Sequence, residues 1–343
     1  MKFKKIISIS CSIITAMSLL AGCGSKPASE GNAETSKELI LYSPHPLEFI
    51  EPLVNEYEVI SEVKVEVVAA GTGELLKRIE SEASNPLGDV LWGGSLTSVS
   101  SYGDYFENYL SANEEFMAEQ HKNTEGFLTR FSDIPSVLMV NDNLIGDIQV
   151  NGYEDLLNPE LKGKIAFADP SKSSSSFEQL INMLYAMGNG NPEDGWEYVS
   201  KLIDNLDGKL LSGSSAVYKG VADGEYTIGL TFEEGAAKFV QSGSPVSLVY
   251  MEEGVISKAD GVYIIKDATN KENAQSFVDF LTSKEAQTIM SEQLNRRSVR
   301  TDVAPPSYLK STEDINLIYD DVQYVTENKS KILEKFSDIF TSN

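Results

Sequence analysis

The residues best suited to chemistry form a polar loop at 169–176, with the sequence Asp-Pro-Ser-Lys-Ser-Ser-Ser-Ser. An apolar run at 165–168 precedes it and an amphipathic run at 176–187 follows it, so we expect a strand, this loop and then a helix. Exposed N–H groups and the helix dipole at such a helix start bind anions, which favours a phosphate or phosphonate cradle over a merely flexible serine-rich loop. The side chains of the cradle would be Lys172, Ser173, Ser174, Ser175 and Ser176.

Three loops in the first part of the chain are also small and polar, at 43–45, 71–74 and 93–95. Each follows a predicted strand, and in open α/β sheets ligands bind beyond the carboxyl ends of the strands. A cap at Thr72 explains the middle loop equally well, and the repetition of such loops is what favours a binding site. The candidate residues here are Ser43, His45, Gly71, Thr72, Gly73, Glu74, Gly94 and Ser95.

A further group lies near residue 230. Ser214 stands before a predicted helix, and a predicted strand at 226–232 brings Thr231, Glu233 and Glu234 to its end. Carboxylates in a cleft would suit ligand hydroxyls or a cationic group. The alternative is that both glutamates are solvated first-turn residues that the helix dipole stabilises. The pattern favours neither interpretation.

Regular elements must hold these loops in position, and strand-like and helix-like runs alternate along the chain. Their order between residues 38 and 92 is βαβαβ, which is typical of a parallel sheet, and a second block of this kind starts near residue 165. We expect short strands at 136–140 and 246–250 where the chain crosses between the blocks. The chain is therefore predicted to be an α/β protein with two lobes. Lobe 1 would comprise 39–140 plus 251–343, including all helices after residue 274, and lobe 2 would comprise 141–250.

The N-terminus has the features of a lipoprotein signal peptide at residues 1–22. Three lysines precede a short apolar run, and Leu-Ala-Gly-Cys at 20–23 resembles a lipobox. Cys23 would then carry the lipid and begin a disordered tether at 23–38, which holds the body on the outer face of the cell membrane or the periplasmic side. No disulfide is expected, because Cys11 leaves with the signal peptide.

The composition of the chain and the motifs that it lacks argue against several classes of function. A net charge of −24 argues against binding of nucleic acid or of anionic lipid by the body. The chain contains no Gly-x-Ser-x-Gly, His-Glu-x-x-His or Walker motif, and its only histidines are His45 and His121, the latter expected to be exposed. We therefore predict no enzyme activity, no cofactor and no metal. A surface adhesin is the alternative of a different class, although it would not need these loops.

The motifs together, in their order and spacing, carry a resemblance over residues 39–304. They are Leu-Tyr-Ser-Pro-His at 41–45, Gly-Thr-Gly-Glu-Leu at 71–75, Asp-Val-Leu-Trp-Gly-Gly at 89–94, the loop at 169–176, Val-Ala-Asp-Gly-Glu-Tyr at 221–226 with Gly-Leu-Thr at 229–231, and Arg-Arg-Ser-Val-Arg at 296–300. The chain resembles extracellular solute-binding proteins of ABC importers, in the group that binds ferric iron, thiamine or phosphonates. The resemblance implies a two-lobed type II periplasmic-binding-protein fold with a two-strand hinge.

The resemblance also implies partners and a ligand class. The partners are an ABC permease and its ATPase, and the simplest expectation is a monomer. Ferric members of the group bind metal with adjacent tyrosines, where this chain has Glu233 and Glu234, and with a glutamate where it has Gly94. The serine-rich loop persists, so the predicted ligand is a small organic phosphate or phosphonate. Ferric iron or thiamine, bound by the same fold, remains the alternative.

Overall fold

The computed structural model describes residues 36–342. The predicted signal peptide at 1–22, the lipid-bearing Cys23 and the predicted tether up to residue 35 lie outside the described residues. The first strand begins at Glu38, the last residue of the predicted tether. In the described part, no helix has both the length and the apolar character needed to cross a membrane.

The first lobe is built on parallel strands whose side chains alternate between two cores. Leu39 and Leu41 of β1 pack with α1, α8 and α9, whereas Tyr42 packs with α2 on the other face. β1 lies between β2 and β3 and pairs with both in parallel, so its alternate residues are buried on both faces. The elements are β1 (Glu38–Ser43), α1 (Leu47–Ser61), β2 (Lys64–Ala69), α2 (Thr72–Ser81), β3 (Val90–Ser95), α3 (Leu96–Val99), α8 (Lys271–Leu281) and α9 (Lys284–Leu294), with 3₁₀ turns at Ser100–Tyr105, Glu114–Phe116 and Glu119–His121.

The second lobe repeats this construction with a smaller sheet. Leu138 and Val140 pack with α4 and α5, and the intervening Val137 and Met139 pack with α6 and α7. β5 pairs with β6 in parallel, and β7 is antiparallel to the strand that enters from the first lobe. The elements are β5 (Ile165–Ala166), α4 (Ser174–Met187), α5 (Trp196–Leu206), α6 (Ser214–Ala222), β6 (Ile228–Phe232), α7 (Glu233–Gln241) and β7 (Val246–Val249), with 3₁₀ turns at Glu154–Leu157 and Pro159–Leu161.

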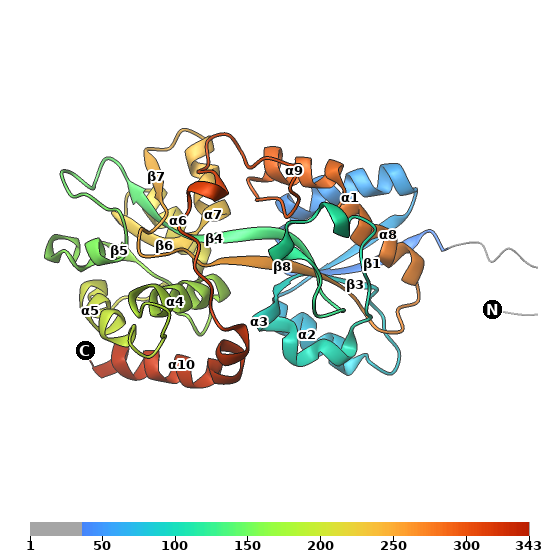
Figure 1. Ribbon diagram of the computed structural model, residues 1–343, viewed down its shortest axis with the longest axis horizontal. Coiled ribbons are helices and arrows are strands. Elements are labelled where there is room, and N and C mark those ends of the chain that lie inside the picture. The colour runs from blue at the N-terminus through green and yellow to red at the C-terminus, as the bar shows by residue number, and fades with distance from the viewer. Residues whose placement is uncertain (1–35, 343) are drawn as a thin grey trace, which may run out of the picture. The chain divides into compact units, whose positions relative to one another are not determined.

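Two long strands join the lobes, which confirms the two-lobed α/β fold and its two-strand hinge (Figure 1). β4 (Thr129–Asn141) pairs with β8 (Ser257–Ile264) as far as Pro135, and from Ser136 onward it pairs with β6 instead. The predicted strand at 136–140 is thus the second half of a longer one. The prediction that 246–250 crosses between the lobes is wrong, because β7 pairs with β4 inside the second lobe.

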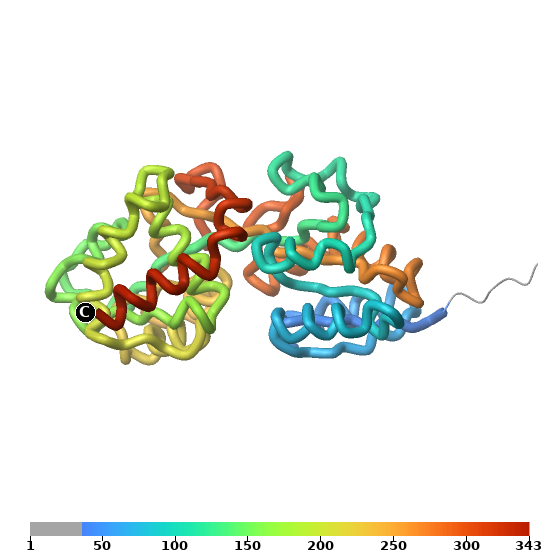
Figure 2. Tube along the Cα trace, turned by 90° about the horizontal axis from the view of Figure 1, so that it is seen from below, coloured from blue at the N-terminus to red at the C-terminus, as the bar shows by residue number. Residues whose placement is uncertain are grey.

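The C-terminal helix α10 (Val322–Ser342) corrects the predicted lobe boundaries. Its buried residues Val325, Ile332 and Phe336 belong to the core formed with α4 and α5, although residues 251–343 were expected in the first lobe. Figure 2 shows this helix, in red, lying along the second lobe. The segment 295–321, which includes a 3₁₀ turn at Thr312–Asp314, is therefore a third connection between the lobes.

Replacing Phe336 by alanine tests this placement of α10. Phe336 is 4 % exposed and its ring lies edge-on to that of Phe167, 6.0 Å between centroids. We expect Phe336→Ala to lower the free energy of unfolding by about 3–5 kcal/mol, because it removes an aromatic side chain from a closed core. Urea unfolding measures the loss. Glu334→Ala, an exposed change on the same helix, should cost less than about 0.5 kcal/mol, and equal effects of the two changes would contradict the packing.

Candidate functional site

The loops that follow β1 and β3 are joined by hydrogen bonds at the carboxyl end of the first sheet. The Ser43 hydroxyl donates to the carbonyl oxygen of Trp92 at 2.7 Å, and it accepts the N–H of His45 at 3.3 Å. The imidazole of His45 lies against the rings of Phe49 and Trp92, with centroids 4.8 and 5.5 Å away. His45 is therefore fixed in position before any ligand binds.

Two glycines allow the loop after β3 to approach His45. Gly93 and Gly94 have φ values of +128° and +105°, a backbone conformation that L side chains rarely adopt. A Cβ on Gly93 would lie 2.8 Å from Pro44 and 3.0 Å from Nε2 of His45. A Cβ on Gly94 would lie 3.2 Å from Thr72, so the loop after β2 adjoins the same point. The three predicted loops of the first lobe thus converge.

A buried carboxylate on the hinge strand, Asp260, holds these loops. Its Oδ1 accepts the N–H of Gly94 at 2.6 Å, and its Oδ2 lies 3.2 Å from Nε2 of His45 and 3.3 Å from Nη1 of Arg296. Burial alone would raise the pKa of Asp260, but the charge and hydrogen bonding of His45, the charge of Arg296 and the Gly94 N–H together lower it. Asp260 is therefore ionised.

Arg296 extends this arrangement to the second lobe. Its Nη2 forms an ion pair with Glu234, at the start of α7, while its guanidinium carbon lies 4.6 Å from the ring centre of Phe49. We call His45, Asp260, Arg296 and Glu234 the Asp260 cluster. The side chains of Asp260 and Arg296 are 8 % and 5 % exposed, and that of Glu234 is 19 % exposed. Of the predicted site residues, the structure thus brings His45, Gly94 and Glu234 together through two residues that the prediction missed.

Glu233 has a different role from its neighbour. Both of its oxygens accept from Nε of Arg297 at 2.9 Å, and Oε2 also accepts from Nη2 at 2.7 Å and from the Tyr250 hydroxyl at 2.6 Å. Although burial opposes it, hydrogen bonding with Glu233 raises the pKa of Arg297, so the guanidinium stays charged. The prediction that Glu233 is solvated is wrong, because the side chain is 1 % exposed and both of its oxygens are hydrogen-bonded within the protein.

Arg297 also connects the third connection to the hinge through hydrogen bonds. Its Nη1 donates to the Thr312 hydroxyl at 2.9 Å and its Nη2 to the carbonyl oxygen of Lys310 at 2.6 Å. Its own carbonyl oxygen accepts the N–H of Asp133 in β4 at 3.1 Å. The pair of Arg297 with Glu233 therefore connects the hinge, the third connection and α7.

The serine-rich loop lies, as expected, between β5 and α4. Ser173 is the N-cap of α4, and its hydroxyl oxygen accepts the N–H of Ser176 at 3.3 Å and the Ser176 hydroxyl at 3.1 Å. Within residues 36–342, no protein acceptor is found for the N–H groups of Ser174 and Ser175. Lys172 is 67 % exposed and forms an ion pair with Asp169 at 3.0 Å. The helix start is thus available to an anion, whereas Lys172 is already paired.

The remaining predicted residues occupy several environments. Gly71 is the N-cap of α2, and neither it nor Gly73 has a neighbour within 4 Å of a built Cβ. Glu74 is exposed, Ser214 begins α6 and is half-buried, and the Ser95 hydroxyl lies 3.2 Å from that of Ser98. Thr231 is 1 % exposed, and its hydroxyl makes no hydrogen bond among the described residues. No hydrogen bond or ion pair links the serine-rich loop to the Asp260 cluster in the described part of the chain.

Sequence reasoning missed Asp260 and assigned no role to Arg296 or Arg297. An Asp just before the apolar residues 262–264 of β8 was a usable signal, because a buried carboxylate requires partners. The pair of adjacent arginines was noticed only as part of a resemblance. His121, expected to be exposed, is 8 % exposed, and burial lowers its pKa although Asp133 is 3.8 Å away.

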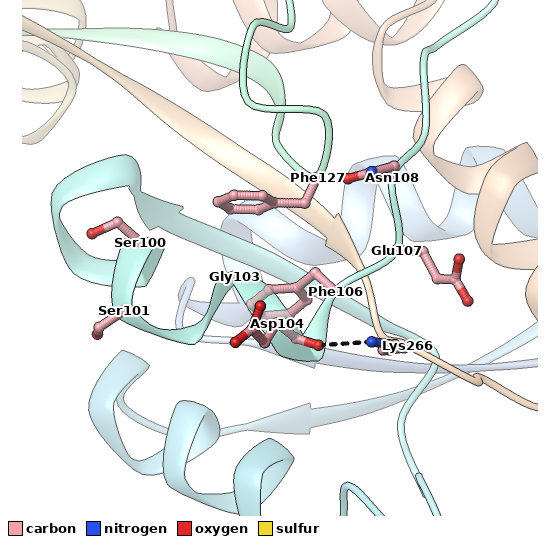
Figure 3. A pocket seen from close by; sticks show the side chains of 9 residues that line it. All are labelled: Ser100, Ser101, Gly103, Asp104, Phe106, Glu107, Asn108, Phe127 and Lys266. Atoms are coloured by element: carbon pink, nitrogen blue, oxygen red, sulfur yellow. Dashed lines mark hydrogen bonds between the residues drawn. The ribbon is translucent and has the colours of Figure 1, made fainter.

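Two hollows lie outside the Asp260 cluster. One of about 570 Å³ is in the first lobe, between Ser100 and Lys266, where the Lys266 ammonium donates to the carbonyl oxygen of Asp104 at 3.3 Å (Figure 3). It contains none of the predicted site residues. The other, of about 490 Å³, is bounded by Lys172 of the serine-rich loop and by Phe336 and Phe340 of α10.

The family of the chain follows from comparison with known proteins. A model of the family described as bacterial extracellular solute-binding protein matches residues 39–293. The chain belongs to this family. It is the substrate-binding protein of an ABC importer, and proteins of this family bind solutes rather than catalyse reactions.

Three known proteins are similar to this solute-binding protein over most of its length. The periplasmic binding protein AfuA from Actinobacillus pleuropneumoniae, solved with bound fructose-6-phosphate, is 25 % identical with a TM-score of 0.79, and the match covers 89 % of this chain and 99 % of AfuA. A protein described as mediating two-component signal transduction is 30 % identical with a TM-score of 0.73, covering 88 % and 99 %. Iron uptake protein A1 of Synechocystis sp. is 23 % identical over 83 % of each chain.

The buried pair of Glu233 and Arg297 gives a testable energetic prediction for the solute-binding protein. Glu233→Ala leaves the guanidinium buried without its partner and should lower the free energy of unfolding by about 3–5 kcal/mol. Combining Glu233→Leu with Arg297→Met should recover more than half of that loss, because no charge is then left unpaired. Urea unfolding of the variants completes the comparison.

An exposed ion pair provides the matched control. Glu197 and Lys201 are paired at 2.7 Å on α5 but are 79 % and 58 % exposed, so Glu197→Ala should leave the free energy of unfolding almost unchanged. A double variant that is no more stable than Glu233→Ala would show that the two residues do not act as a pair.

Proposed function

We propose that this solute-binding protein captures a small phosphorylated or phosphonate organic solute for import, with a sugar phosphate as the favoured ligand. The observation that carries the proposal is the start of α4, where the N–H groups of Ser174 and Ser175 have no acceptor among the described residues and hydroxyls stand beside them. Free N–H groups at a helix start, aligned with its dipole, suit a phosphate group.

The pairing of the carboxylates supports a ligand that is uncharged apart from its phosphate or phosphonate group. Glu233 is bound by Arg297, and Glu234 and Asp260 share Arg296. A cationic group would have to displace a buried guanidinium to reach these oxygens. Hydroxyl groups need no such exchange, and AfuA, a relative with a matching fold, is known with a sugar phosphate bound. Ferric iron or the cationic ring of thiamine is the less favoured alternative.

Location and partners complete the proposal. Cys23 carries lipid, so the protein is anchored outside the cytoplasm on the cell membrane, where it delivers ligand as a monomer to an ABC permease and its ATPase. An adhesin role is disfavoured, because it would not require an anion site at a helix start.

Thermal unfolding of the purified protein tests the ligand class. The probes are fructose-6-phosphate, inorganic phosphate, 2-aminoethylphosphonate, thiamine phosphate and ferric citrate. A ligand that binds only the folded protein at 100 times its dissociation constant stabilises it by about 2.7 kcal/mol, so we expect a rise in midpoint with fructose-6-phosphate. Stabilisation by ferric citrate alone would overturn the ligand class, and no response to any probe would favour an adhesin.

A variant with an added negative charge in the serine-rich loop tests where the phosphate group binds. Ser175→Asp places a carboxylate at the start of α4 and should abolish the response to sugar phosphate, because two anions would then compete for the same N–H groups. Ser330→Asp makes the same charge change at an exposed position of α10 and should leave the response intact. An unchanged response in Ser175→Asp would place the phosphate elsewhere.

Sensing is a second candidate function. Its support is the 30 % identity, over 88 % of the chain, to a protein described as mediating two-component signal transduction. Deleting the protein from cells with a constitutively expressed permease distinguishes the roles. An importer component predicts that ligand uptake is lost, whereas a sensor predicts that uptake continues and only ligand-dependent transcription disappears.

A further inference from the structure

Arg296 lies between two carboxylates, and one of them is also paired with an imidazole. Its Nη1 is 3.3 Å from Oδ2 of Asp260, which is itself 3.2 Å from Nε2 of His45, and its Nη2 is paired with Glu234. One imidazole and two carboxylates are ligands that divalent and trivalent metal ions accept. In this chain, the guanidinium of Arg296 lies between the two carboxylates.

The surroundings hold that guanidinium in place. Nη1 also donates to the hydroxyl of Ser132 at 3.2 Å, and the planar group lies over the ring of Phe49. Only 5 % of the side chain is exposed. Arginine cannot lose its proton in a protein, so its positive charge is permanent. A permanent positive charge therefore lies between the two carboxylates and offsets part of their negative charge.

One atom of Arg296 distinguishes it from Arg297. Arg297 uses Nε, Nη1 and Nη2 in hydrogen bonds. The Nε of Arg296 is buried and has no acceptor among the described residues. A buried donor without a partner calls for a specific explanation, such as a bound water or ligand that accepts from it. The Arg297 side chain is therefore committed to the fold, whereas Arg296 retains one donor.

We propose that Arg296 is the specificity-determining residue of the site. It serves as a built-in cation that excludes metal ions and cationic solutes from the Asp260 cluster, and so leaves the site to anionic and neutral groups. This inference rests on the proposed function only in treating the Asp260 cluster as part of the ligand site.

A matched pair of variants tests the role of the charge. Arg296→Ala removes the guanidinium and should allow Co²⁺, added alone, to bind on the order of 100-fold more tightly than to the unmodified protein, because Asp260 and Glu234 then lose the cation that they share. Arg296→Lys disrupts the same hydrogen bonds but keeps a positive charge, and should bind no better than the unmodified protein. Calorimetry and the visible absorption of Co²⁺ report binding, and Arg296→Gln replaces the alanine variant if that does not fold.

Two further measurements complete the test. Guanidinium ion at millimolar concentration should displace Co²⁺ from Arg296→Ala, and adding His45→Ala to that variant should abolish the gain. Equal Co²⁺ affinities in the alanine and lysine variants, or a gain that survives loss of His45, would overturn the proposal. Failure of the unmodified protein to bind any of the phosphorylated or phosphonate probes would overturn the proposed function instead, and would leave the Co²⁺ comparison valid.

Discussion

The carboxylate of Asp260 is the interaction on which the candidate site depends. The residue lies on β8, opposite Ser95 of β3 on one side and Ser132 of β4 on the other, and is therefore surrounded by sheet. A buried carboxylate is stable only when charges and hydrogen-bond donors surround it. The Gly94 N–H, His45 and Arg296 meet this need, and in doing so they bring the loops of the first lobe to the hinge.

Adjacent arginines connect the two lobes in different ways. Arg297 is bonded to α7, to the third connection and to β4, so it stabilises the junction itself. Arg296 faces the acidic and imidazole groups at the strand ends. In a chain with a net charge of −24, the carboxylates at this point are thus paired with buried arginines.

The third connection adds a constraint to the two-strand hinge. The main-chain groups of Val255 pair with Asn316 and Ile318 at 2.9 and 3.0 Å, and Lys258 of β8 lies between Asp320 at 2.5 Å and Glu178 at 3.7 Å. The C-terminal segment therefore follows the start of β8 before α10 joins the second core. Any closing motion of the lobes must bend this segment together with β4 and β8.

The sequence alone determined the fold class, the strand-end loops and the order of the elements. Those features depend on local periodicity and on turn residues, which neighbouring positions express directly. It could not determine that α10 joins the second core, because the apolar stripe of an amphipathic helix specifies burial without naming a partner.

Nor could it determine which partner each carboxylate has. Glu233 and Glu234 are adjacent and chemically identical, yet one is paired with Arg297 and the other with Arg296, more than sixty positions along the chain. Such pairing depends on contacts between distant segments, and only the tertiary structure brings those segments together.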